Sequence, residues 1–103
     1  TPFSTTEETS KAFTDAYVAA YGIEPNQFAA DSYDAVYAVK AAIEQSGVTP
    51  DMSVSDICEA MKTAMTEITF DGLTGEGMTW SADGEPAKAP KAMKIVDGAY
   101  TAM

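Results

Sequence analysis

Acidic side chains supply most of the groups in this chain that could take part in chemistry. Asp31 and Asp34 lie three residues apart, and Asp71 and Glu76 lie five apart. Two carboxylates at short range can divide the roles of general acid and general base. Such pairs are weak evidence here, because 16 of the 103 residues are Asp or Glu. With no His, no Arg, no nucleophile elbow and no cofactor-binding fingerprint, we expect neither an enzyme nor a bound cofactor.

Metal binding is the second chemistry that the acidic residues could serve. Three Asp-Gly pairs, at 71–72, 83–84 and 97–98, resemble pieces of oxygen-ligand loops for calcium. An EF-hand needs alternating ligands at five positions before its terminal Glu, and no window of the chain provides them. Cys58 is the only cysteine, so it can complete neither a zinc site nor an intrachain disulfide. We predict solvated turns and no metal site.

The charge balance restricts the possible partners. The formal net charge is −10, with six Lys and no Arg. Nucleic acid is therefore excluded as a partner, and recognition of an anion would depend on Lys, hydroxyl or backbone N–H groups. No apolar run approaches the ~20 residues of a membrane span, and residues 1–4 resemble no signal peptide. We expect a soluble chain whose export signal was removed or lies upstream.

Three helices must position these groups. Two overlapping capping boxes, Ser4 with Glu7 and Thr5 with Glu8, predict a first helix over about 7–21, which Gly22 ends. Asn26 is a good N-cap for a second helix over 28–46, with Gly47 as its stop. Apolar residues cover more than one side of this second helix, so we expect it to be buried on more than one side.

A third helix and short strands complete the predicted α/β order. Ser53 and Asp56 can cap the third helix. Its apolar face consists of Val54, Ile57, Met61, Ala64, Met65 and Ile68. Short β-like runs follow at 69–70, 77–80 and 93–96 and at Tyr100, with a turn at 83–84. The prediction is three helices followed by two or three short strands.

Six runs, in this order and spacing, resemble the C-terminal part of the leucine/isoleucine/valine-binding proteins, which have the type I periplasmic binding fold. The runs are AYGIEP at 20–25, FAADSYDAVY at 28–37, AIEQSG at 42–47, FDGLTG at 70–75, TWSADGE at 79–85 and KIVDGAY at 94–100. The resemblance implies two lobes joined by three crossovers, with the ligand in the cleft between them. It also implies that residues 1–103 form a partial domain, mostly in the first lobe, and that about 93–103 return toward the second lobe.

One ligand contact can be carried over from the family. Phe28 matches an aromatic residue that packs on the ligand from the first lobe, and Asp31, one turn further on, is a weaker candidate. From the residues alone, core packing is the favoured role for Phe28. With the resemblance included, a ligand-facing role in the full-length protein becomes the favoured role for Phe28. The family's N-terminal segments, which carry most groups that hold the ligand's ammonium and carboxylate, are not in this chain.

The resemblance implies an import receptor. Such a protein captures a small polar solute, an amino acid or a related compound, outside the cytoplasm and presents it to the membrane permease of an ABC importer. It would reside in the periplasm or on the cell surface as a lipoprotein. The alternatives are the ligand-sensing domain of a signalling receptor with the same fold, and a free-standing acidic adapter. For the 103 residues alone we predict self-association, most simply as a dimer, because three helices and a short ribbon cannot cover the second helix.

Overall fold

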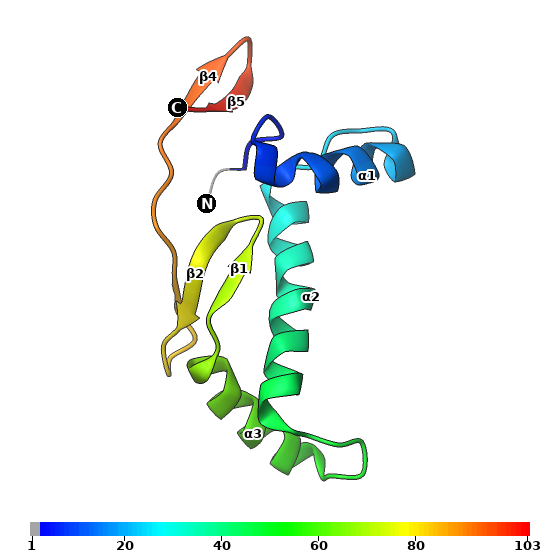
Figure 1. The fold of residues 1–103 in the computed structure, drawn as a ribbon, viewed down its shortest axis with the longest axis vertical. Coiled ribbons are helices and arrows are strands. Elements are labelled where there is room, and N and C mark those ends of the chain that lie inside the picture. The colour runs from blue at the N-terminus through cyan, green and yellow to red at the C-terminus, as the bar shows by residue number, and fades with distance from the viewer. Residues whose placement is uncertain (1–2) are drawn as a thin grey trace.

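The computed structural model describes residues 3–103, which form an elongated α/β unit of 51 × 29 × 18 Å (Figure 1). Within these residues a short 3-10 helix and three α-helices come first, and five short strands follow. In chain order the elements are η1 (Glu8–Ser10), α1 (Lys11–Tyr21), α2 (Gln27–Ser46), α3 (Val54–Glu67), β1 (Phe70–Gly72), β2 (Gly75–Trp80), β3 (Pro86–Ala87), β4 (Met93–Val96) and β5 (Ala99–Ala102). The predicted order of three helices and then short strands is confirmed.

Local capping explains where α2 and α3 begin and end. The Asn26 Oδ1 accepts a hydrogen bond of 3.0 Å from the Ala29 N–H, and the Ser53 Oγ accepts one of 3.1 Å from the Asp56 N–H. Gly47 adopts a left-handed conformation with φ of 68° and donates its N–H to the Ile43 carbonyl. These contacts confirm the predicted caps and place α2 one residue earlier than the sequence suggested.

The capping boxes predicted for the first helix are wrong. The buried Ser4 hydroxyl pairs with the Thr6 hydroxyl at 2.8 Å and accepts from the Thr6 N–H, so it does not reach a helix terminus. The Ser4 carbonyl accepts a hydrogen bond from the Ser10 hydroxyl. The chain therefore makes a tight loop, then the turn η1, and begins its α-helix only at Lys11. Ser4 fastens the loop instead of capping the helix.

Small side chains allow α2 to approach its neighbours closely. Ala30, Asp34, Ala38 and Ala42 lie four residues apart and are all buried. Ala42 packs with Ala64 and Ile68 at the centre of the core between α2 and α3. The β1–β2 hairpin runs alongside the same helix (Figure 1). One face of α2 is thus covered by its own chain.

Aromatic rings join α1 to α2. The ring centroids of Phe13 and Tyr33 are 4.8 Å apart, and those of Tyr33 and Tyr37 are 5.0 Å apart. Both pairs are tilted, which is a favourable arrangement for aromatic rings. The neighbouring Tyr37 hydroxyl raises the pKa of the Tyr33 phenol. The cluster fixes α1 across the N-terminal half of α2.

The strands form two separate antiparallel groups. β2 pairs with β1 on one side, with Phe70 opposite Met78, and with β3 on the other, with Trp80 opposite Pro86. The predicted turn at 83–84 joins β2 to β3, and Gly84 has φ of 87°. β4 and β5 form an isolated hairpin whose turn, Asp97-Gly98, has positive φ at both residues.

The opposite face of α2 is left open. The α2 stripe, as we call it, is a row of exposed apolar residues along this helix. It consists of Phe28, Val36, Val39 and Ile43, which are 45–70% exposed. The prediction that the chain cannot cover this helix by itself is confirmed. Within residues 3–103, no helix has both the length and the apolar character needed to cross a membrane.

Candidate functional site

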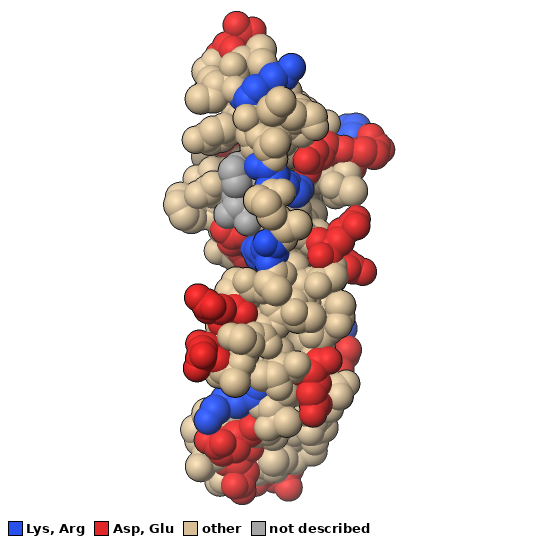
Figure 2. Space-filling model, turned by 90° about the vertical axis from the view of Figure 1, so that its left-hand side faces the viewer, with Lys and Arg blue, Asp and Glu red and all other residues tan. Residues whose placement is uncertain are grey.

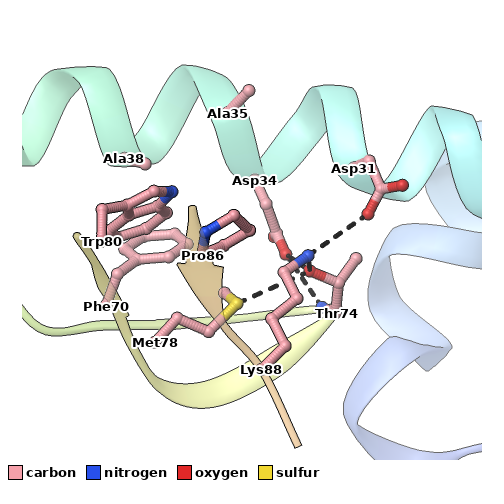
Figure 3. A pocket seen from close by; sticks show the side chains of 10 residues that line it. All are labelled: Asp31, Asp34, Ala35, Ala38, Phe70, Thr74, Met78, Trp80, Pro86 and Lys88. Carbon is pink, nitrogen blue, oxygen red and sulfur yellow. Dashed lines mark hydrogen bonds and ion pairs between the residues drawn. The ribbon is translucent and has the colours of Figure 1, made fainter. Parts of the chain in front are cut away.

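The first candidate site is a cavity of 450 Å³ between α2, the β1–β2 hairpin and the segment that follows β3. Figure 3 shows Asp31 and Asp34 extending from consecutive turns of α2 toward Thr74 and Lys88. The lining residues are Asp31, Asp34, Ala35, Ala38, Phe70, Thr74, Met78, Trp80, Pro86 and Lys88. The cavity therefore combines a polar end with an apolar end.

Asp34 closes the turn between β1 and β2. Its carboxylate accepts hydrogen bonds from the Leu73 N–H at 2.9 Å, the Thr74 N–H at 2.8 Å and the Thr74 hydroxyl at 2.7 Å. A buried carboxylate that accepts from three donors is fully engaged in holding the turn. The pairing of Asp31 with Asp34 for acid and base chemistry therefore finds no support in this geometry.

Gly72 makes the approach of Asp34 possible. A Cβ atom at position 72 would lie 2.6 Å from the carboxylate carbon and from both oxygens of Asp34. Real Cβ contacts are not that short, so any side chain here would push the carboxylate away. Gly72 is thus explained by the close approach of the Asp34 side chain, whereas the sequence suggested only a turn.

Lys88 links the two acidic residues of the cavity. Its Nζ donates to the Thr74 hydroxyl at 2.8 Å and lies 3.5 Å from the Asp31 Oδ1. The Asp31 Oδ1 is buried and has no hydrogen-bond partner among the described residues, so its contact with Lys88 is an ion pair without a hydrogen bond. Asp31, Lys88, Thr74 and Asp34 form a continuous polar chain across three segments.

The polar groups of the cavity are engaged with one another. The Thr74 hydroxyl donates to Asp34 and accepts from Lys88, so its hydrogen-bonding groups are already used. The other end is apolar, with the rings of Phe70 and Trp80 6.5 Å apart. Among residues 3–103, no three His, Cys, Asp or Glu side chains are grouped closely enough to hold a metal ion. The polar chain fastens segments together.

Phe28 lies in a different place. It lines a second cavity of 390 Å³ between the N-terminus of α2 and the β4–β5 hairpin, opposite Tyr100. The ring is 67% exposed, so core packing within the described chain does not account for it. The structure therefore separates the two predicted ligand contacts, Phe28 and Asp31, into two cavities. Tyr100, which the sequence did not single out as a site residue, lines the same cavity as Phe28.

Comparison with solved structures shows where this fold occurs. An ABC transporter substrate-binding protein from Desulfitobacterium hafniense aligns with 100% of the chain at a TM-score of 0.73 and 19% identity. A putative branched-chain amino acid ABC transporter protein from Rhodospirillum rubrum aligns with 98% of it at a TM-score of 0.70 and 23% identity. The chain spans only 30% and 28% of those two structures. No curated protein sequence is similar enough to count as a match.

A family model gives the assignment at the level of sequence. The model described as "Periplasmic binding protein" matches residues 1–99. The match includes every run on which the resemblance to the leucine/isoleucine/valine-binding proteins was based, except the last residue of 94–100. The similarity in fold to the two ABC transporter structures agrees with this family match. The chain belongs to the periplasmic binding protein family.

Proposed function

We propose that the intact protein containing this chain captures a small polar solute outside the cytoplasm and delivers it to the permease of an ABC importer. Support comes from the family match over residues 1–99 and from the two structural neighbours, both described as parts of ABC transporters. An amino acid, branched-chain or related, is the proposed solute class, in line with the description of the Rhodospirillum rubrum protein. The function requires binding and release, without a chemical step.

The proposed domain arrangement puts residues 1–92 mostly in the first lobe and residues 93–103 on the path to the second. In support, β4 and β5 contact each other and no other helix or strand of residues 3–103. Val36, Val39 and Ile43 of the α2 stripe are the proposed contact for the remainder of the first lobe, whereas Phe28 lines a cavity. An exposed apolar face of this kind is buried when the parts that normally pack on it are present.

Phe28 is the proposed ligand contact, and its exposure is the observation that carries this assignment. A two-thirds exposed aromatic ring at a helix N-terminus, facing a cavity, can pack on an apolar solute side chain. Asp31 lies one turn further on, and its carboxylate already faces Lys88. We propose it as a secondary contact that could engage the solute's ammonium group only by exchanging that partner.

Replacement of Phe28 by Ala in the intact protein tests the assignment. Loss of the ring should weaken leucine binding by ~1 to 3 kcal/mol, measured by isothermal titration calorimetry, with little change in thermal stability. Val54→Ala is the matched control, because Val54 is 78% exposed on α3 and lies outside both the Phe28 cavity and the α2 stripe. Equal affinity of the wild type and Phe28→Ala for every amino acid that binds would overturn the assignment.

The 103-residue chain provides a second arm of this test. One aromatic wall cannot supply the partners that an amino acid's ammonium and carboxylate groups need, so the isolated chain should bind no amino acid measurably. Saturable micromolar binding to this chain alone would contradict the proposal that the site is completed by other parts of the intact protein.

A further inference from the structure

The segment between β3 and β4, together with the start of β4, carries an unusual share of the positive charge. Lys88, Lys91 and Lys94 recur every third residue and account for three of the six Lys in the chain. Residues 88–92, which we call the strap, have no helix or strand assignment and run along the outside of the molecule (Figure 1). Pro90 lies within the strap and has a restricted φ. In Figure 2, blue side chains follow one another along the upper half of the face that carries this segment.

Two lysines attach the strap to the helices and loops beneath it. Lys88 contacts Thr74 and Asp31, as described above. The Lys91 Nζ donates to the Glu7 carboxylate at 3.0 Å, which joins residues 84 positions apart. Both side chains of this second pair are less than one-third exposed. Partial burial and long sequence separation distinguish it from the exposed i,i+4 pair of Lys40 with Glu44.

The β4–β5 hairpin depends on the strap for its place. β4 and β5 pair only with each other among the described strands, and they contact no described helix. The hairpin nevertheless supplies Gly98, Ala99 and Tyr100 to the wall of the Phe28 cavity. The position of that wall relative to α2 is therefore set largely by the segment that leads into β4.

We propose that Lys88 and Lys91 are positioning residues: their ion pairs fasten the strap to Asp31 and Glu7 and so hold the β4–β5 hairpin opposite Phe28. The positioning follows from contacts within this chain. Its consequence for solute binding rests on the proposed function of Phe28. Because both pairs are electrostatic and partly exposed, raising the ionic strength from ~0.15 to ~1 M should loosen the hairpin by shortening the Debye length from ~8 to ~3 Å.

A distance measurement without solute tests the strap directly. Nitroxide labels are placed on the exposed Cys58 and on an Ala99→Cys replacement in the hairpin, and the chain is diluted with unlabelled protein to suppress intermolecular distances. Lys91→Glu should broaden the distance distribution and move its mean, because it sets two carboxylates against each other. The double variant Glu7→Lys with Lys91→Glu exchanges the two charges of the pair and should restore the wild-type distance distribution.

Matched variants show whether a change in the distance distribution comes from loss of the strap's ion pairs or from a general effect of charge. Lys40→Glu makes the same charge change beside Glu44 on α2 and should leave the distribution unchanged. Lys88→Met, which removes the other attachment, should broaden it. An unchanged distribution in Lys91→Glu would overturn the proposal, as would a failed rescue by the charge exchange or equal broadening in Lys40→Glu. Since no solute is present, these outcomes are independent of the Phe28→Ala result.

Discussion

Asp34 illustrates how one side chain can fix the geometry of a distant turn. Its three donors come from residues 39 and 40 positions later in the chain, at the point where β1 turns into β2. Gly72 leaves the space that the carboxylate occupies. Hydrogen bonds to a charged group are stronger than neutral ones, so the three contacts offset the cost of burying the carboxylate.

Replacement of Asp34 by Asn should destabilise the fold. The amide offers one acceptor oxygen and turns an NH₂ group toward backbone donors, so at least one N–H loses its partner. We expect a loss of ~1.5 to 3 kcal/mol in the free energy of unfolding, measured by urea titration. Asp15→Asn is the control, since Asp15 forms an exposed pair with Lys11 and its replacement should cost about 0.5 kcal/mol or less. Equal losses in the two variants would show that the Asp34 contact is unimportant.

At the scale of the elements, α2 and α3 are joined by small residues. Ala42 is completely buried and Ala64 nearly so, and both touch Ile68. The larger side chains of Met61, Met65 and Trp80 close the edges of this contact. Alanine at the two central positions sets how closely the helix backbones approach.

Enlargement of Ala42 to Leu should separate the two helices. The added side chain has no space in the core, so we expect a destabilisation of ~1 to 3 kcal/mol in the free energy of unfolding. Ala20→Leu, at an exposed position of α1, is the control and should change stability by less than about 0.5 kcal/mol. Thermal unfolding followed by circular dichroism provides the comparison. A stable Ala42→Leu variant would mean that α2 and α3 pack more loosely than the structure shows.

At the scale of the whole molecule, the chain has two kinds of surface. Acidic residues are scattered over the outside, as Figure 2 shows for one face, and the net charge is −10. The α2 stripe breaks this pattern with four exposed apolar side chains on one helix. Net charge opposes non-specific association, whereas an apolar stripe favours association through one defined face.

Self-association of the isolated chain therefore remains a prediction. We expect a dimer by light scattering at high micromolar concentration, formed through the α2 stripe or by strand pairing between chains. Val36→Glu should shift the dimer to monomer if the stripe is the contact. Val54→Glu, at a 78% exposed position of α3, makes the same change outside the stripe and should not. A stable wild-type monomer would refute the prediction.

The local parts of the structure were predictable from the sequence. The ends of α2 and the start of α3 depend on Asn26, Gly47 and Ser53, each of which acts within four residues of itself. The order of short runs was sufficient to indicate the family, which the match over residues 1–99 confirms. Short-range hydrogen bonds and backbone preferences act identically in a segment and in the folded chain, so such features can be derived from spacing alone.

The contacts across the chain were decided by tertiary structure. Spacing allowed Asp31 and Asp34 to act as a pair, but Asp34 is engaged by the turn after β1 and Asp31 by Lys88. Ser4 had the spacing of a capping residue and is instead buried in a loop. Phe28 lies in a cavity that the hairpin at Tyr100 completes. For Asp31, Asp34 and Phe28 the partner is far away in sequence, so the contact forms only when the chain has folded. Ser4 is instead engaged by Thr6 and Ser10 within its own loop.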